Sequence, residues 1–255
     1  MLTKLLDGAM GTQLAQRGFE LRAPLWGARA IEDSPALVVA IHAAYAAAGA
    51  ELLVSASFGL DAQHAALATT AVELARHAAP ELPCVGCLGP ADPSLSLDEQ
   101  REHYTALGQA LKAGGAAALF AETQTSVAGA HLAVDALRPF GLPVWVALAC
   151  GVDGKSLGGD ALQVPLAADV VFVGCTEHGG LLPALHNLAS HNPVLAVRPS
   201  LARTIAEGFD ASGASEAEVV DAIERCRSEF ELAYVGGCCG TTPAFTAALA
   251  KVLRV

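Results

Sequence analysis

The sequence lacks three features that would each indicate a different class of protein. No apolar run reaches the roughly 18 residues that cross a membrane. Basic residues are scarce, because 15 Lys and Arg face 26 Asp and Glu for a formal net charge of −11, whereas nucleic-acid binders usually present a basic face. The 7 cysteines have no regular spacing, so they predict no disulfide framework. We therefore expect neither a nucleic acid nor a membrane as partner.

A targeting signal is also missing from the start of the chain. Residues 1–4, Met-Leu-Thr-Lys, have no basic patch, apolar core or cleavage site of a signal peptide. The expected location is the cytoplasm. In that reducing compartment, clustered cysteines more often serve metals or catalysis than disulfides.

Apolar residues make up 53% of the 255 residues and charged residues only 16%. Parallel strands covered by helices on both faces produce this bias. Short apolar runs alternate with helical stretches, which begin at Pro35, after the capping pattern Ser96-x2-Glu99, and near positions 179, 215 and 243. The predicted strands are 4–9, 51–57, 83–88, 117–122, 144–149, 170–174, 194–197 and 234–237.

This pattern predicts an α/β fold, a (β/α)8 TIM-type barrel with parallel strands that forms a single domain over residues 1–255. Periodicity alone does not distinguish a closed barrel from an open doubly wound sheet, which is the alternative. Residues 151–166 are rich in glycine with only a short helical stretch, so we expect one degenerate βα unit there.

Polar side chains and cysteines follow several predicted strands. Asp7 follows the first strand, Glu122 the fourth, Cys175 the sixth, and Cys238 and Cys239 the last. The carboxyl ends of the strands of a parallel barrel share one rim, where the βα loops build active sites. We therefore expect these side chains to meet in one pocket.

Cys238 and Cys239 stand side by side in residues 236–243, Gly-Gly-Cys-Cys-Gly-Thr-Thr-Pro. Their Cα atoms are only about 3.8 Å apart, so a disulfide between them would be strained. Together with Cys175 they could hold a soft metal, Zn²⁺ with one open position. The alternative is that they are small buried hydrophobic residues.

The other cysteines are weaker candidates. Cys84 and Cys87 have metal-site spacing, but residues three apart on a strand point to opposite faces. Cys150 and Cys226 are interpreted as packing residues. His178 is a possible fourth ligand, although a histidine just past a strand is more often solvated.

Asp7 and Glu122 have two interpretations. Either could cap a turn or form a salt bridge near the loops. A carboxylate that ends a buried strand is costly without a cationic partner, however, and the ammonium group of a substrate would be such a partner. We expect both carboxylates to bind substrate.

At these positions the chain resembles the homocysteine S-methyltransferase family. The resemblance rests mainly on residues 7–12, Asp-Gly-Ala-Met-Gly-Thr, and on the specific segment 236–243. Weaker matches are Pro24-Leu25-Trp26, His42-x2-Tyr45, Leu88-Gly89-Pro90, Glu122-Thr123 and Gly174-Cys175.

The resemblance implies zinc held by Cys175, Cys238 and Cys239, and Asp7 and Glu122 around the amino acid part of homocysteine. The zinc-bound thiolate of the substrate would then attack the methyl group of the donor and give methionine, with no other catalytic residue. We expect no cobalamin or folate module beyond the barrel, and aromatic residues that could cage betaine are few. We therefore expect a sulfonium donor, S-methylmethionine or S-adenosylmethionine.

The chain departs from the family at the seventh strand. A Tyr-Pro-Asn-Ser-Gly-type element is usual there, whereas this chain has Arg198-Pro199-Ser200. Arg198 would then contact a carboxylate or form a surface ion pair.

Two other functions stay open, a redox enzyme that uses Cys238 and Cys239, and a non-catalytic relative that binds zinc and thiols. The oligomeric state is not predicted.

Overall fold

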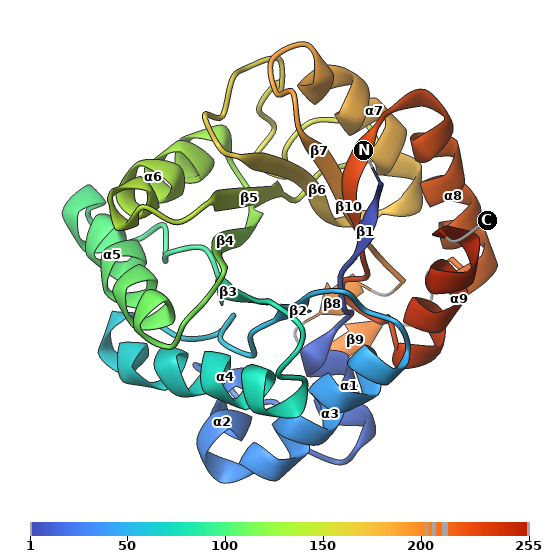
Figure 1. The fold of residues 1–255 in the computed structure, drawn as a ribbon. Coiled ribbons are helices and arrows are strands. Elements are labelled where there is room, and N and C mark those ends of the chain that lie inside the picture. The colour runs from blue at the N-terminus through green and yellow to red at the C-terminus, as the bar shows by residue number, and fades with distance from the viewer. Residues whose placement is uncertain (1, 202, 206–207, 211–213, 254–255) are drawn as a thin grey trace.

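Eight parallel strands form a ring surrounded by helices (Figure 1). The computed structural model describes residues 2–201, 203–205, 208–210 and 214–253, so positions 1 and 254–255 of the predicted domain lie outside it. The strands of the ring are β1 (Lys4–Leu5), β2 (Leu53–Val54), β3 (Cys84–Leu88), β4 (Ala118–Gln124), β5 (Val144–Leu148), β6 (Val170–Glu177), β7 (Leu195–Ser200) and β10 (Leu232–Val235).

The ring is closed. Its strand order is β1-β10-β7-β6-β5-β4-β3-β2, and every adjacent pair is parallel. A parallel bridge between Leu6 and Leu52 joins the two ends, and the amide of Asp7 donates to the carbonyl of Leu52 at 3.2 Å. The predicted (β/α)8 barrel is therefore confirmed, and the open-sheet alternative is wrong.

Helices cover the outside of the ring, and the capping patterns in the sequence explain two of their starts. Ser96 and Ser215 each form a capping box with the glutamate three residues later. None of the described helices is long and apolar enough to cross a membrane. The α-helices are α1 (Met10–Gln16), α2 (Ala30–Asp33), α3 (Pro35–Ala47), α4 (Ala65–Ala78), α5 (Leu97–Ala113), α6 (Val127–Leu137), α7 (His178–Ala189), α8 (Glu216–Glu229) and α9 (Pro243–Leu253), with 3-10 turns at Gly27–Arg29, Ala62–His64 and Arg138–Phe140.

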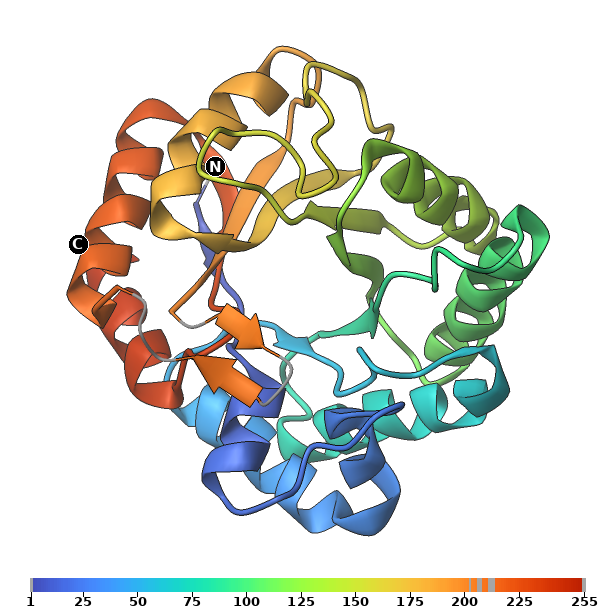
Figure 2. The same cartoon turned by 180° about the vertical axis from the view of Figure 1, so that it is seen from behind.

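The structure differs from the prediction in the bounds of several strands, in one connection and in an additional hairpin. The first two strands are shorter than predicted, because the chain leaves the sheet before Asp7 and after Val54. The 149–169 connection contains no helix, so the unit there is degenerate and the short helical stretch is absent. A hairpin of β8 (Arg203–Ile205) and β9 (Gly208–Asp210) follows β7 and lies in front of the ring in Figure 2.

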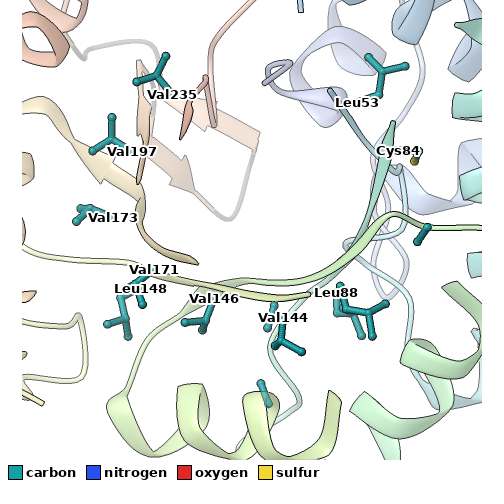
Figure 3. Close-up of a cluster of buried hydrophobic side chains, with 14 of the residues drawn as sticks. Leu53, Cys84, Leu88, Val144, Val146, Leu148, Val171, Val173, Val197 and Val235 are labelled. Atoms are coloured by element: carbon teal, nitrogen blue, oxygen red, sulfur yellow. The ribbon is translucent and has the colours of Figure 1, made fainter. Parts of the chain in front are cut away.

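Alternation along the strands divides the buried side chains into two sets. One set points from the ring toward the helices and includes Val146, Val173 and Val197 (Figure 3). The other set fills the barrel, and its centre is an aromatic cluster of Phe120, Trp145, Phe172 and Tyr234. Phe120 and Phe172 have ring centroids 4.6 Å apart, and Trp145 and Tyr234 4.5 Å. We call these four residues the aromatic layer.

Candidate active site

Charged side chains point into the barrel directly above the aromatic layer. Glu122 follows Phe120 by two residues on β4, so the two share the inner face of the strand. Arg198 follows Ala196 by two residues on β7 and lies over the ring of Phe120, with Cζ 5.9 Å from the ring centroid. Strand alternation thus places a carboxylate and a guanidinium side by side at the carboxyl ends of the strands.

Cys175 is placed by an irregularity in β6. The register with β7 shifts between Gly174 and Thr176, and Cys175 has φ of 50°. This left-handed conformation costs a non-glycine residue about 1–2 kcal/mol. Bulges of this kind redirect a side chain next to active sites. Here the bulge brings the Cys175 sulfur to the turn after β10.

The turn that carries Cys238 and Cys239 is fixed on both sides by backbone hydrogen bonds. The amide of Cys238 donates to the carbonyl of Pro199 at 2.8 Å, and the carbonyl of Cys239 accepts from Leu201 at 2.8 Å. The hydroxyl of Thr241 donates to the carbonyl of Cys238 at 2.7 Å. A Cβ on Gly237 would lie only 2.3 Å from that hydroxyl oxygen, so the tight turn requires glycine.

The three sulfur atoms lie within 4.8 Å of one another, and those of Cys175 and Cys239 are 3.7 Å apart. Sulfur ligands about 2.3 Å from a tetrahedral zinc ion are about 3.8 Å apart. Hydrogen bonds with Cys238 and Cys239, together with burial, raise the pKa of Cys175 well above its ordinary value. A divalent cation would favour the thiolate forms that three crowded thiols otherwise resist. The donor set fits zinc.

The remaining cysteines are all buried. Cys84 packs outside the ring and Cys87 inside it, as expected for residues three apart on a strand. Cys150 and Cys226 belong to the outer core, as predicted. Among the described residues, His178 is not part of the group of potential metal ligands.

Asp7 and Glu122 are brought together by Arg198. The guanidinium contacts Glu122 directly through Nη1, and its Nη2 lies 3.7 Å from Oδ1 of Asp7. The other oxygen of Asp7 accepts from the amide of Val54 at 2.9 Å. Burial lowers the pKa of the neighbouring His42 to about 4, so His42 is neutral and Arg198 supplies the positive charge.

Two carboxylates share this one guanidinium. Burial raises the pKa of Asp7 to about 7 and that of Glu122 to about 7, while Arg198 opposes both shifts. With both acids ionised, the three side chains carry one more negative charge than positive. A further positive charge beside them would favour this fully ionised form.

A cavity of about 410 Å³ joins these groups. Its lining includes the three clustered cysteines, Glu122 and Arg198. Sequence reasoning left Arg198 undecided and did not assign Cys87 to this cavity, which it also lines. The signal for both was strand alternation, since each lies on the inner face of its strand.

Asp7 lies behind this cavity. Within the described part of the chain, Asp7 is not among the lining residues, and it is 2% exposed. Its carboxylate lies beside Arg198, Val54 and His42, so it braces the guanidinium from behind.

Comparison with known proteins identifies this arrangement. The family model described as homocysteine S-methyltransferase matches residues 4–253. The chain belongs to the homocysteine S-methyltransferase family.

One solved structure shares the fold over nearly the whole chain, and a second protein matches part of the sequence. The structure of the homocysteine methyltransferase MmuM from Escherichia coli, in its metallated form, has a TM-score of 0.80 and 24% identity, covering 99% of this chain and 96% of that one. A homocysteine S-methyltransferase from Escherichia coli is 42% identical over 85 residues, which are 29% of this chain and 27% of that protein.

The methionine synthase of Mycobacterium tuberculosis is 28% identical over 300 residues. The match covers 97% of this chain but 25% of the synthase. The methionine synthase of Mycobacterium leprae is likewise matched over 23% of its length. The chain thus spans about a quarter of these curated relatives.

Proposed function

We propose that this protein is a zinc-dependent methyltransferase that moves a methyl group from a sulfonium donor to the thiol of homocysteine, giving methionine. The observation that carries the proposal is the group of three sulfur atoms within 4.8 Å of one another in a member of this family. These sulfurs line the same cavity as Glu122, so a thiol and the charged end of one small molecule would fit together there.

Cys175, Cys238 and Cys239 would hold the zinc ion. When bound, zinc with an open position supplies Lewis acidity that lowers the pKa of an acceptor thiol. The protein contributes position, because the turn carrying Cys238 and Cys239 is tied to β7 and to the start of the chain. The amide of Gly240 donates to the hydroxyl of Thr12 at 3.0 Å.

Glu122 and Asp7 are the groups proposed to favour the ammonium of homocysteine. Glu122 lines the cavity and offers the direct contact. Asp7 acts from behind, since its negative charge adds to the surplus that attracts a cation. Holding the ammonium at a fixed place also fixes the sulfur of the same molecule, which is the positional part of catalysis.

The chemical step balances with no reactant beyond solvent water. The acceptor thiol gives its proton to water, its sulfur forms a bond to the methyl carbon, and the bond from that carbon to the donor sulfonium sulfur breaks. The bonding electrons stay with the donor sulfur, which leaves as a neutral thioether. The sulfonium charge thereby disappears from the donor sulfur.

The proposal of a sulfonium donor depends on the outer part of the cavity. Its aromatic lining in the described residues consists of Trp26 and Phe58, which are 39% and 44% exposed. Cages for quaternary ammonium ligands surround the cation with several aromatic faces. Two partly exposed rings do not form such a cage, which favours a sulfonium donor over betaine.

A donor panel tests the proposal. Zinc-loaded protein is incubated with homocysteine and with S-methylmethionine, S-adenosylmethionine or betaine, and methionine is measured by mass spectrometry. We expect methionine with a sulfonium donor and none from a Cys239→Ala variant. Cys226→Ala, which changes a buried cysteine on α8, is the matched control and should keep activity.

The two alternative functions give other results in the same experiment. A redox enzyme would bind no zinc and would oxidise and reduce Cys238 and Cys239 reversibly. A non-catalytic relative would bind zinc and homocysteine but form no methionine from any donor. Either result would reject the proposed methyl transfer.

A further inference from the structure

Arg198 has a position that the cysteine cluster does not explain. It is 4% exposed, points into the barrel from β7, and lines the cavity together with Glu122 and the three cysteines. A buried charge is costly unless partners satisfy it. Asp7 and Glu122 supply the balancing charge, but they leave part of the guanidinium unused.

The hydrogen bonds of Arg198 show which part is unused. Nε donates to the carbonyl of Gly237 at 3.1 Å, and Nη1 contacts Oε1 of Glu122. Nη2 is 3.7 Å from Asp7, which is beyond hydrogen-bond length. A guanidinium has five N–H donors in a planar fork that suits a carboxylate. Arg198 therefore keeps donors for one more acceptor group.

The neighbourhood of those donors is fixed. The bond from Nε to Gly237 ties the side chain to the residue that precedes Cys238. The ring of Phe120 lies beneath the guanidinium, and Asp7 braces it from behind. The distance between the N–H donors of Arg198 and the turn of Cys238 is thus fixed. A fixed distance is required to recognise both ends of one small molecule.

Glu122 and Arg198 carry charges opposite to those of the two charged groups of an α-amino acid. An α-amino acid carries its ammonium and its carboxylate on one carbon atom. An ammonium beside Glu122 would bring its carboxylate next to Arg198, since the two side chains are in contact. Binding would exchange the one ion pair between Arg198 and Glu122 for two ion pairs with the ligand, while Asp7 stays beside Arg198.

We infer that Arg198 binds the carboxylate of the acceptor thiol and so determines the choice of acceptor, while Glu122 binds its ammonium group. The inference rests on the proposed function for the identity of the acceptor. Asp7 is then a positioning residue that holds the guanidinium toward the cavity.

Three thiols test this inference. They are homocysteine, 3-aminopropane-1-thiol, which lacks only the carboxylate, and 4-mercaptobutanoate, which lacks only the ammonium. Binding to the zinc-loaded protein is measured by calorimetry without a donor, so the result does not depend on turnover. For the wild type we expect loss of the carboxylate to weaken binding at least about 30-fold, as for a hydrogen-bonded charged pair.

Variants assign that penalty to one side chain. In Arg198→Met the two thiols that differ by the carboxylate should bind within about threefold of each other. In Glu122→Gln, the matched control, loss of the ligand's carboxylate should still weaken binding, which we call the carboxylate penalty. Loss of the ligand's ammonium should weaken binding less than in the wild type. Arg198→Lys, which keeps the charge but loses the fork, should give an intermediate carboxylate penalty and provides the test if Arg198→Met does not fold.

The inference is wrong if the wild type binds homocysteine and 3-aminopropane-1-thiol equally, whatever the variants do. It is also wrong if the carboxylate penalty is the same in the wild type, Arg198→Met and Arg198→Lys. A carboxylate penalty that depends on Arg198, with no methionine formed from any donor, would support the inference and reject the proposed methyl transfer. The two failures are therefore distinguishable.

Discussion

The interior of the barrel has two layers that the same strands build in opposite ways. In the aromatic layer, Phe120, Trp145, Phe172 and Tyr234 pack ring against ring. The next inward position on β4 is Glu122, and on β7 the inward position after Ala196 is Arg198. Apolar burial stabilises the lower layer, whereas burial of charge costs free energy in the upper one. The comparison assigns stability to one layer and chemistry to the other.

The largest expected effect tests whether chemistry belongs to the upper layer, that is, to the cavity lined by Glu122, Arg198 and the three clustered cysteines. Replacing Cys239 with Ala removes one of the three clustered sulfurs, and two thiolates hold zinc much more weakly. We expect loss of stoichiometric zinc by elemental analysis and a fall in methyl transfer of at least about 1,000-fold. Cys226→Ala should keep its zinc. Stoichiometric zinc in Cys239→Ala would contradict the assignment.

The second prediction concerns the aromatic layer. Phe172→Ala removes a fully buried ring that packs on Phe120 and Trp145. We expect the free energy of unfolding to fall by about 3–5 kcal/mol. Zinc content per folded molecule should stay unchanged, since no ligand is touched. Urea unfolding followed by tryptophan fluorescence measures the change, with the exposed Val152→Ala as control.

If Phe172→Ala loses zinc while the protein stays folded, the two layers are not independent. A loss of stability below about 1 kcal/mol would show that the aromatic layer tolerates a cavity.

The third prediction concerns the turn that carries the proposed metal ligands Cys238 and Cys239. In Gly237→Ala the new Cβ would clash with the side chain of Thr241. The hydroxyl of Thr241 donates a hydrogen bond to the carbonyl of Cys238. We expect a loss of about 1–3 kcal/mol in unfolding free energy together with weaker zinc affinity, measured by chelator competition. In Gly179→Ala on α7 the nearest atom would be 3.9 Å away, so this control should be close to neutral.

An unchanged zinc affinity in Gly237→Ala, with the expected loss of stability, would separate the turn from the metal site. The role of the tight turn would then be packing alone.

The smallest expected effect separates two roles within the upper layer, binding of homocysteine and binding of zinc. Glu122→Gln keeps the shape of the side chain but removes its charge. Homocysteine binding should weaken about tenfold, because the ammonium loses its charged partner, while zinc binding stays the same. Calorimetry with homocysteine and chelator competition for zinc measure the two. Equal homocysteine affinity in the variant and the wild type would reject Glu122 as a substrate ligand.

Much of the site could be predicted because its residues follow buried strands. The positions of Cys175, Cys238 and Cys239 at strand ends follow from parallel strands that share one rim, and the structure brings the three sulfurs together. The left-handed backbone of Cys175 could not be predicted, because a bulge depends on the register with the neighbouring strand. The sequence does not predict the β8–β9 hairpin either, since strands of three residues are too short to show an apolar periodicity.

By itself the sequence determined the α/β class, the alternation of the main strands and helices, and the residue types at the rim, since these follow from local periodicity and composition. Closure of the ring was decided by the tertiary structure. Only the tertiary structure decided which carboxylate lines the cavity and which lies behind it. It also placed Arg198 between Asp7 and Glu122, on strands far apart along the chain. The physical reason is that a buried charge takes its partners from whichever strands the closed ring brings opposite it.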